Sequence, residues 1–384
     1  MWRDGIPIGK AFGIALKLNY SWFIVFGLVT WSLAAFYFPL TYPTWSTATS
    51  IIAGVVTSLL LFGSVMAHEL SHSVVAQSTG IVIHSIVLFI FGGVSQMSDE
   101  PKKPKDEFRI AIAGPLSSIV IGGIFFGIRL LFNSPGNVVG AIASQLSVIN
   151  IFLALFNLIP GFPLDGGRVL RSILWGRNNN LRQATKTASN IGRGVGYLFI
   201  FAGVYVIFGG TIPLFGGIVI RGLINGLWFA FIGWFLENAA VGSYRQLALR
   251  DMLRGHTVKE VMTQECPLVA PDTTIEKLVN EQILATGRRC FPVAEDNRSL
   301  GLITLHNVKS VPREQWGRTR VREAMTPFEN LKWVRPDQDL DSVLALLADA
   351  DVNQVPVVED HKIVGMVARD KLLAFINVRS ELGG

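Results

Sequence analysis

The sequence predicts a polytopic α-helical membrane domain of about six transmembrane helices, followed by a soluble α/β domain. Half of the 384 residues are hydrophobic and only 16% are charged, whereas a soluble globular protein is nearer a quarter charged. Residues 1–242 have a net charge of +7 and residues 243–384 a net charge of −1. The excess of basic over acidic residues therefore belongs to membrane loops, and we expect no nucleic-acid partner.

The front of the chain contains several segments that reach the roughly 20 apolar residues required of a membrane-spanning helix. Six segments have this character: residues 18–40, 48–78, 107–132, 138–160, 188–209 and 214–238. Loops that contain Lys and Arg alternate with loops that contain neither, and cytoplasmic loops carry the basic excess. We therefore expect an integral, multi-pass protein of a prokaryotic plasma membrane, embedded in the lipid bilayer with both termini in the cytoplasm.

Segment 81–98 differs from these helices. It is rich in β-branched residues and contains the pair Gly92-Gly93, which predicts a short membrane-associated β-hairpin. Irregular or extended backbone is tolerated at membrane depth only where protein or a wet cavity surrounds it. His84 in this segment has the chemistry of a metal ligand, but we favour an interfacial polar side chain.

Residues 68–72 read His-Glu-Leu-Ser-His, inside the second apolar segment. Between residues 48 and 76 the only ionisable side chains are His68, Glu69 and His72. Two His at i and i+4 share one helix face and can hold one metal ion between them. Because ionisable groups in hydrocarbon are costly, this cluster indicates a functional site rather than a chance match.

Asp165 is the best candidate for a third metal ligand, because a catalytic zinc site takes three protein ligands and keeps one position open. It ends the run Asn157-Leu-Ile-Pro-Gly-Phe-Pro-Leu-Asp165, whose prolines should break the fourth helix and let the carboxylate turn inward. Taken alone, Asp165 could equally be a helix N-cap. His68 and His72 are expected roughly 10–15 Å below the cytoplasmic boundary, on the same side as Asp165.

The soluble part contains an internal repeat with an offset of 63–65 residues. The matched segments are Val258–Thr263 with Val321–Thr326, Pro271-Asp272 with Pro336-Asp337, Phe291–Asp296 with Val355–Asp360, and Gly301–Thr304 with Gly365–Ala368. Each copy is predicted to fold as strand, helix, strand, strand, helix. Two cysteines, Cys266 and Cys290, exclude a disulfide scaffold.

The two metal motifs, together with Ala-Gly-Pro-Leu at 113–116, resemble the site-2 protease family of intramembrane zinc metalloproteases. The repeat resembles the tandem cystathionine-β-synthase (CBS) domains carried by one branch of that family. The resemblance covers essentially the whole chain. The predicted parts are a transmembrane metalloprotease domain at 1–242, a linker at 243–255, and CBS domains at 256–312 and 319–378.

One departure from the family pattern follows the Gly-Pro-Leu motif. The family often has Asn a few residues later, where this chain has Ser117 and Ser118. We expect this difference to affect helix packing more than chemistry.

The resemblance implies a metalloendopeptidase with one zinc ion per chain, held by His68, His72 and Asp165, with Glu69 as the catalytic carboxylate. The roles suggested by the residues themselves are the same. The expected reaction is hydrolysis of a peptide bond within or near the transmembrane helix of a membrane-anchored protein substrate, as in regulated intramembrane proteolysis.

Three further residues are candidates for contacts to the substrate or the oxyanion: Asn157, Gly92 and Gly93. Asn157 could equally make an interhelical hydrogen bond. An unwound substrate segment could add as a strand to the edge formed by residues 86–96.

Paired CBS units usually bind adenine nucleotides, and many carry Thr or Ser followed by a ribose-binding Asp. In this chain Thr304 fits the pattern and Ala368 does not, while Asn307 and Lys371 stand at the Asp positions. Ribose binding is therefore in doubt, although Lys371 could contact a phosphate. Nucleotide sensing and a structural role in homodimer formation both stay open.

The main alternative is a CBS-regulated membrane transporter or channel. That alternative predicts paired half-helices or internal repeats in the membrane part, and residues 1–240 show no convincing repeat. A third possibility is a catalytically inactive scaffold, but the presence of Glu69 argues against it.

Overall fold

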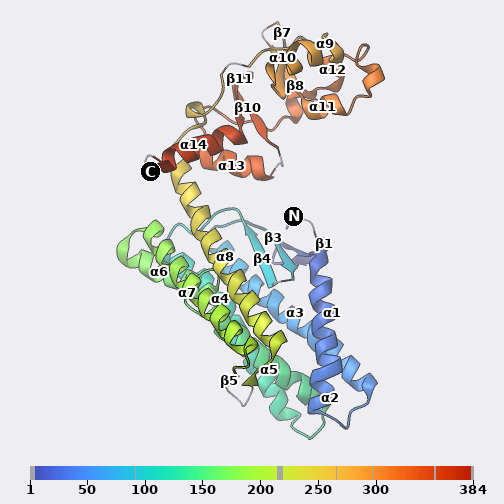
Figure 1. The fold of residues 1–384 in the computed structure, drawn as a ribbon, viewed down its shortest axis with the longest axis vertical. Helices are drawn as coiled ribbons and strands as arrows, with labels where there is room; N and C mark the ends of the chain where they lie inside the picture. The colour runs from blue at the N-terminus through green and yellow to red at the C-terminus, as the bar shows by residue number, and fades with distance from the viewer. Residues whose placement is uncertain are drawn as a thin grey trace. The chain divides into compact units, whose positions relative to one another are not determined.

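The computed structural model describes residues 5–90, 92–213, 219–264, 266–296, 298–349 and 352–381. The chain divides into two compact units, Met1–Arg245 and Gln246–Gly384. Within the first unit, Figure 1 shows long helices running side by side, with a β-sheet at one end of them.

The first unit contains most of the long helices. Its helices are α1 (Tyr20–Ser32), a π-helical turn (Leu33–Tyr37), α2 (Phe38–Thr41), α3 (Thr47–Ser78), α4 (Pro104–Leu131), α5 (Val138–Asn157), α6 (Asp165–Asn178), α7 (Leu181–Ile207) and α8 (Leu223–Leu253), whose last residues belong to the second unit. Its strands are β1 (Ile6–Ala11), β2 (Ile14–Leu18), β3 (Ile83–Phe89), β4 (Gly92–Met97), β5 (Ile212–Pro213) and β6 (Val219–Ile220). Polar side chains cap several helix starts; Ser46 and Asn180, for example, accept from the backbone of α3 and α7.

Five helices in the described part of the chain are long and apolar enough to cross a membrane, as five of the six predicted segments require. They are Tyr20–Thr41, α3, α4, α5 and α7. The sixth predicted segment, 214–238, begins with five residues outside the described part and continues into α8, which is not among the five. The predicted polytopic helical architecture is confirmed.

The predicted hairpin is present as β3 and β4, which pair antiparallel. It is part of a larger sheet of order β1-β2-β3-β4, in which β2 and β3 run parallel. The hairpin β1–β2 was not predicted from the sequence. Ile83 and Ile86 of β3 pack with Ile14, Ala76 and Ile110, so the sheet is fixed against α3 and α4. Strand β4 lies at one edge of the sheet and β1 at the other.

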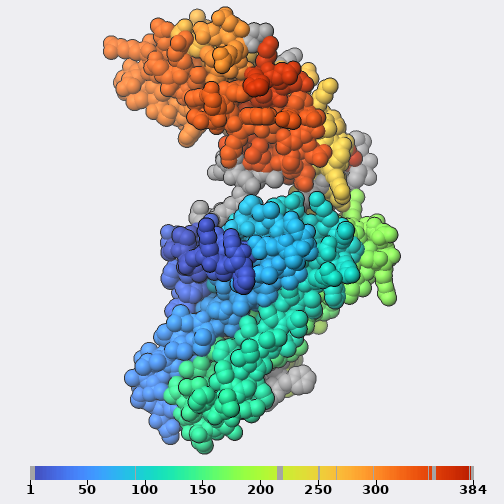
Figure 2. All heavy atoms as spheres, turned by 180° about the vertical axis from the view of Figure 1, so that it is seen from behind, coloured from blue at the N-terminus to red at the C-terminus, as the bar shows by residue number. Residues whose placement is uncertain are grey.

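The interior of the first unit contains polar and small residues as well as apolar ones, and many large apolar side chains face outward. Asn150 of α5 is fully buried and its amide Nδ2 lies 3.3 Å from Ser64 Oγ of α3. Large exposed side chains such as Phe126, Leu130 and Phe201 line the outside. On the face drawn in Figure 2, the blue to teal segments, which include α3, α4 and α5, form the surface of this unit. This arrangement suits a helical bundle in lipid.

The second unit has the predicted duplicated form. Its described strands are β7 (Cys290–Glu295), β8 (Arg298–Thr304), β9 (Thr326–Pro327), β10 (Gln354–Glu359) and β11 (Lys362–Ala368). Its helices are α9 (Ile275–Lys277), a π-helical turn (Leu278–Ile283), α10 (Leu284–Thr286), α11 (Leu305–Lys309), α12 (Val321–Ala324), α13 (Leu340–Asp349) and α14 (Arg369–Glu381), with short 3₁₀ turns at Val258–Glu260, Arg313–Gln315 and Phe328–Asn330.

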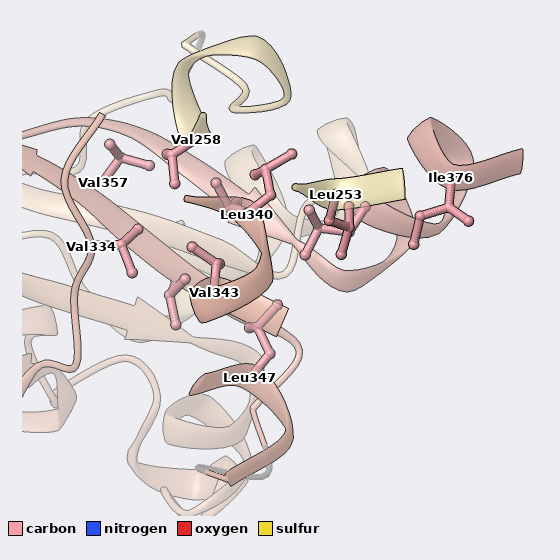
Figure 3. Packing of buried hydrophobic residues seen from close by; sticks show 11 residues of the cluster. Leu253, Val258, Val334, Leu340, Val343, Leu347, Val357 and Ile376 are labelled. Atoms are coloured by element: carbon pink, nitrogen blue, oxygen red, sulfur yellow. The ribbon is translucent and has the colours of Figure 1, made fainter. Parts of the chain in front are cut away.

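Each copy of the repeat lends a short segment to the sheet of the other. Thr326, in the second copy, pairs with Leu302 of β8, and Thr263, in the first copy, bridges to Met366 of β11. Two apolar cores support the sheets. Figure 3 shows one of them, where Val334, Leu340, Val343 and Leu347 gather beneath the strands.

Candidate metal centre

The structure brings His68, His72 and Asp165 together through one atom each. His68 and His72 lie one turn apart on α3 and are 4% exposed. Their Nε2 atoms are 3.3 Å apart, and each lies 3.1 Å from Asp165 Oδ2. These three form the only group of three or more His, Cys, Asp or Glu, among the described residues, with donor atoms close enough for one metal ion.

Asp165 reaches the histidines because the chain breaks after α5 and restarts as α6. Asp165 is the first residue of α6, and Leu164 occupies the N-cap position. Asp165 is therefore not the N-cap of α6, and that alternative prediction is wrong. A Cβ atom on Gly166 or Gly167 would overlap the backbone of the preceding loop, so only glycine lets the helix fold back this closely.

The Asp165 carboxyl is ionised in this setting. Burial raises the pKa of Asp165, but hydrogen bonding to His68 and His72 outweighs burial and holds the pKa well below its ordinary value. An ionised oxygen facing two ring nitrogens is an appropriate donor for a divalent cation.

Helix α4 fixes the orientation of both imidazoles. His72 Nδ1 lies 2.6 Å from the carbonyl oxygen of Ile110, and His68 Nδ1 lies 2.9 Å from Ser118 Oγ. A carbonyl oxygen can only accept, so a neutral His72 carries its proton on Nδ1 and presents the lone pair of Nε2 to a metal ion. Partners of this kind on the second ring nitrogen are typical of metal-binding histidines.

Gly114 of α4 leaves the space that the two rings occupy. A Cβ atom at this position would lie 2.6 Å from His68 Nε2, and closer still to His72 Nε2. Ile110, Gly114 and Ser118 are spaced by four residues, so one stripe of α4 faces the two histidines.

The donor set fits a zinc ion. Donors of a tetrahedral zinc with bonds of 2.0–2.1 Å are about 3.3 Å apart, close to the 3.1–3.3 Å separations among the three donor atoms. Two imidazoles and a carboxylate are also a recurrent ligand set of catalytic zinc.

Glu69 lies beside this cluster and under the β3–β4 hairpin. Ser95 Oγ of β4 is 3.5 Å from Glu69 Oε2, and it also bonds Ser73 Oγ at 2.9 Å. A Cβ atom on Gly93 would lie 3.0 Å from Glu69 Cδ, so Gly93 lets the strand approach the carboxylate. Gly92 adopts a φ of +126°, with open space where a side chain would be.

Asn157 and His84 are the other polar candidates in the membrane part. Asn157 ends α5, and its Nδ2 donates to the carbonyl oxygen of Leu153 at 3.0 Å, within the same helix. His84 on β3 is exposed and does not belong to the metal-binding group.

The polar residues considered for nucleotide binding take part in local structure. Thr304 caps α11, and its Oγ1 lies 2.6 Å from Asn307 Oδ1. Asn307 Nδ2 lies 3.3 Å from Thr326 Oγ1, which joins the two copies of the repeat. Lys371 is exposed on α14.

Sequence reasoning missed the residues that contact the candidate ligands. Ser118 contacts His68 directly, so the expectation that Ser117 and Ser118 affect packing more than chemistry is corrected for Ser118. The four-residue spacing of small residues Gly114 and Ser118 in an apolar helix was the available signal. Ser95 follows Gly93 by two residues, which places both on the same face of the strand.

Comparisons with known proteins identify relatives of both parts of the chain. The Peptidase family M50 model matches residues 56–145 and 133–203, and the CBS domain model matches residues 258–314 and 321–378. "Putative zinc metalloprotease sll0528" of Synechocystis sp. is 34% identical over 97% of this chain and 95% of that protein. "Zinc metalloprotease MJ0392" of Methanocaldococcus jannaschii is 30% identical over 97% of this chain and 96% of that protein.

Among solved structures, the site-2 protease from Methanocaldococcus jannaschii is 30% identical and covers 63% of this chain and 96% of that chain, with a TM-score of 0.41. Two relatives of nearly full length, at 30% identity or more, are named zinc metalloproteases. The resemblance seen in the sequence motifs is confirmed. The chain therefore belongs to peptidase family M50, the site-2 protease family of zinc metalloproteases, in a form that carries a pair of CBS domains.

Proposed function

We propose that this protease hydrolyses a peptide bond within or near the transmembrane helix of a membrane-anchored protein, as in regulated intramembrane proteolysis. The observation that carries the proposal is the convergence of His68, His72 and Asp165 beside Glu69, in a unit whose long helices are apolar enough to cross a membrane. We assign the first three as ligands of one zinc ion per chain and Glu69 as the catalytic carboxylate.

In the proposed hydrolysis, the zinc ion and Glu69 have different roles. A zinc ion held at this site would polarise the scissile carbonyl and acidify a water molecule. Glu69 takes a proton from the attacking water and delivers it to the leaving amine. The Ser95 hydroxyl, 3.5 Å from Glu69 Oε2, limits the positions of the carboxylate from the hairpin side.

Strand β4 is the proposed binding edge for an unwound substrate. It ends the sheet, so its outer edge offers backbone groups for strand addition. Its residue Gly93 lies against Glu69, the carboxylate proposed for catalysis, and this supports a substrate contact at Gly92 and Gly93. Asn157 could serve the oxyanion only after exchanging its hydrogen bond to Leu153.

A proline scan tests the binding edge. Proline at Val94 or Gln96 should reduce cleavage strongly, because proline removes a backbone donor from the strand. Ile8→Pro and Lys10→Pro in β1, the opposite edge of the same sheet, are the matched controls. Loss of cleavage from both edges alike would point to sheet instability rather than substrate binding.

The CBS pair is proposed to sense an adenine nucleotide, and the competing proposal is a structural role in dimer formation. Lys371 is exposed and is the cation proposed to meet a phosphate, whereas Thr304 and Asn307 are engaged with each other. Titration of ATP and AMP into the full chain by calorimetry, with Lys371→Met as the control, separates the two. No heat at millimolar ligand would favour the structural role.

The proposed location is a prokaryotic plasma membrane with both termini in the cytoplasm. The support is the alternation of basic and uncharged loops. Reporter fusions at the two ends should both give the cytoplasmic signal.

Two measurements test the catalytic assignment. Elemental analysis should find one zinc per chain in the wild type and little in His68→Ala. Glu69→Gln should keep its zinc but lose cleavage of a membrane-anchored test substrate. A wild-type protein that stays metal-free when supplied with zinc would contradict the proposal and favour the transporter alternative.

A further inference from the structure

A buried ion pair joins α6 to α4 beside the candidate metal centre. Arg171 of α6 is 7% exposed and Glu107 of α4 is fully buried. Arg171 Nε donates to Glu107 Oε1 at 2.6 Å, and Arg171 Nη2 pairs with the same oxygen. Arg171 Nη1 also lies 3.6 Å from Glu100 Oε2, so the guanidinium spans two carboxylates.

The same guanidinium contacts the loop that delivers Asp165. Its central carbon lies 5.1 Å from the centre of the Phe162 ring, within the range of a cation–π contact. Phe162 precedes Asp165 by three residues, and its backbone N–H donates to the carbonyl oxygen of Ala188 on α7. Arg171 therefore touches α4 and the Asp165 loop at once.

Glu107 lies on the stripe of α4 that faces the histidines. Glu107, Ile110, Gly114 and Ser118 follow at i, i+3, i+7 and i+11, which is one helix face. The three later positions hold or accommodate the imidazoles of His68 and His72. Glu107 pairs with Arg171 of α6, the helix that begins with Asp165. One face of α4 is therefore connected to all three candidate ligands.

Stability alone gives a poor account of this pair. Burying two charges costs several kcal/mol per ion, and apolar replacements of buried pairs are often neutral or stabilising. Glu107 Oε2 is buried without a hydrogen-bond partner among the described residues, so the pair is not fully compensated. What the pair does provide is a fixed register between α4 and α6.

We propose that Arg171 and Glu107 are positioning residues for Asp165. They brace the start of α6 and its preceding loop against α4, and so set the separation between Asp165 Oδ2 and the two Nε2 atoms. The inference rests on the proposed function, because it takes Asp165 as a zinc ligand.

The test compares metal binding in the full-length protein. Arg171→Met and Glu107→Gln should each weaken zinc binding about tenfold or more, measured by competition with a chromophoric chelator. The absorption bands of the cobalt-substituted protein should shift, because the ligand geometry changes. The double variant should be no worse than the poorer single variant, since both changes break one contact.

A matched control is the ion pair between Arg193 of α7 and Glu237 of α8, where the nitrogen–oxygen distance is 3.3 Å and Arg193 is 42% exposed. Arg193→Met should change zinc affinity less than twofold. Arg171→Lys, which keeps the charge without the planar fork, should fall between wild type and Arg171→Met. If Arg171→Met does not fold, the isosteric variant Glu107→Gln tests the positioning role on its own.

Wild-type zinc affinity and an unchanged cobalt spectrum in both Glu107→Gln and Arg171→Met would overturn the positioning role. Wild-type protein that binds no metal would instead overturn the proposed function, so the two failures are distinguishable.

Discussion

The two units of this protein differ in the polarity of their interiors. In the first unit the buried side chains include Glu107, Asn150 and Arg171 and several Ser and Thr beside the apolar ones, and many large apolar side chains face outward. In the second unit every buried side chain that the structure describes is apolar, as in the cluster around Leu347 shown in Figure 3. Lipid explains the difference, because apolar burial gives no gain where the solvent is itself apolar.

The contrast shows what holds each unit together. In the first unit, small residues allow close approach, and hydrogen bonds such as Asn150 to Ser64 join the helices. In the second, apolar area removed from water supplies the stability. A substitution should therefore act through geometry in one unit and through cavity formation in the other.

The largest effect is expected at Gly114. Gly114→Ala should reduce cleavage about 100-fold or more, because its methyl group would fall where the imidazoles lie and displace them by a fraction of an ångström or more. Zinc content and substrate cleavage are the measurements. Gly123→Ala on the same helix meets no atom within 4 Å and is the control. Equal activity in the two variants would contradict the close packing.

The next effect is expected in the second unit. Leu347→Ala should destabilise that unit by about 2–5 kcal/mol, because it leaves a cavity in a close-packed aliphatic core. Urea unfolding can be followed by exposure of the two cysteines, both of which lie in this unit. Leu373→Ala, at a side chain 48% exposed, should change the midpoint little. Similar midpoints for both variants would show that the core is not the source of stability.

The reactivity of the Cys290 thiol tests how strongly the second unit disfavours a buried charge. Burial raises the pKa of Cys290 to about 12, with a smaller contribution from Cys266. Because only the thiolate reacts, Cys266→Ser protein should be alkylated at pH 8 about 100-fold more slowly than an exposed thiol, and the rate should rise with pH. A cysteine at Leu284, which is 72% exposed, in a background without Cys266 and Cys290, is the comparison. Equal rates would mean that Cys290 is accessible.

The smallest effect is expected at Ser118. Ser118→Ala removes the partner of His68 Nδ1 and should weaken zinc binding about tenfold. Ser117→Ala is the neighbouring control, since the Ser117 hydroxyl donates to the carbonyl oxygen of Gly114 in its own helix. Chelator competition measures both. No difference between them would show that the hydroxyl at 118 does not orient the ring.

The sequence predicted those features of the fold and site that depend on residues close together along the chain. The spacing of His68 and His72, the break before Asp165 and the period of the repeat each depend on neighbours along the chain, and the structure has the corresponding helix, loop and duplicated fold. The apolar runs likewise predicted five helices correctly.

The parts that were missed depend on how separate helices align. The contacts of Ile110 and Ser118 with the histidines, and the pairing of Arg171 with Glu107, require the register of α4 against α3 and α6. Nothing in the spacing of one segment specifies that register. The hairpin β1–β2 was missed because its sequence leads directly into an apolar helix.

The exchange of short segments in the second unit has a consequence for its two halves. Thr326 of the second copy pairs with β8, and Thr263 of the first copy pairs with β11. Separating the two copies would therefore remove a paired backbone segment from each of them. A single copy expressed alone would expose raw strand edges, the usual starting point for aggregation. The smallest viable fragment is thus the intact tandem, and a shortened protein should retain both copies or neither.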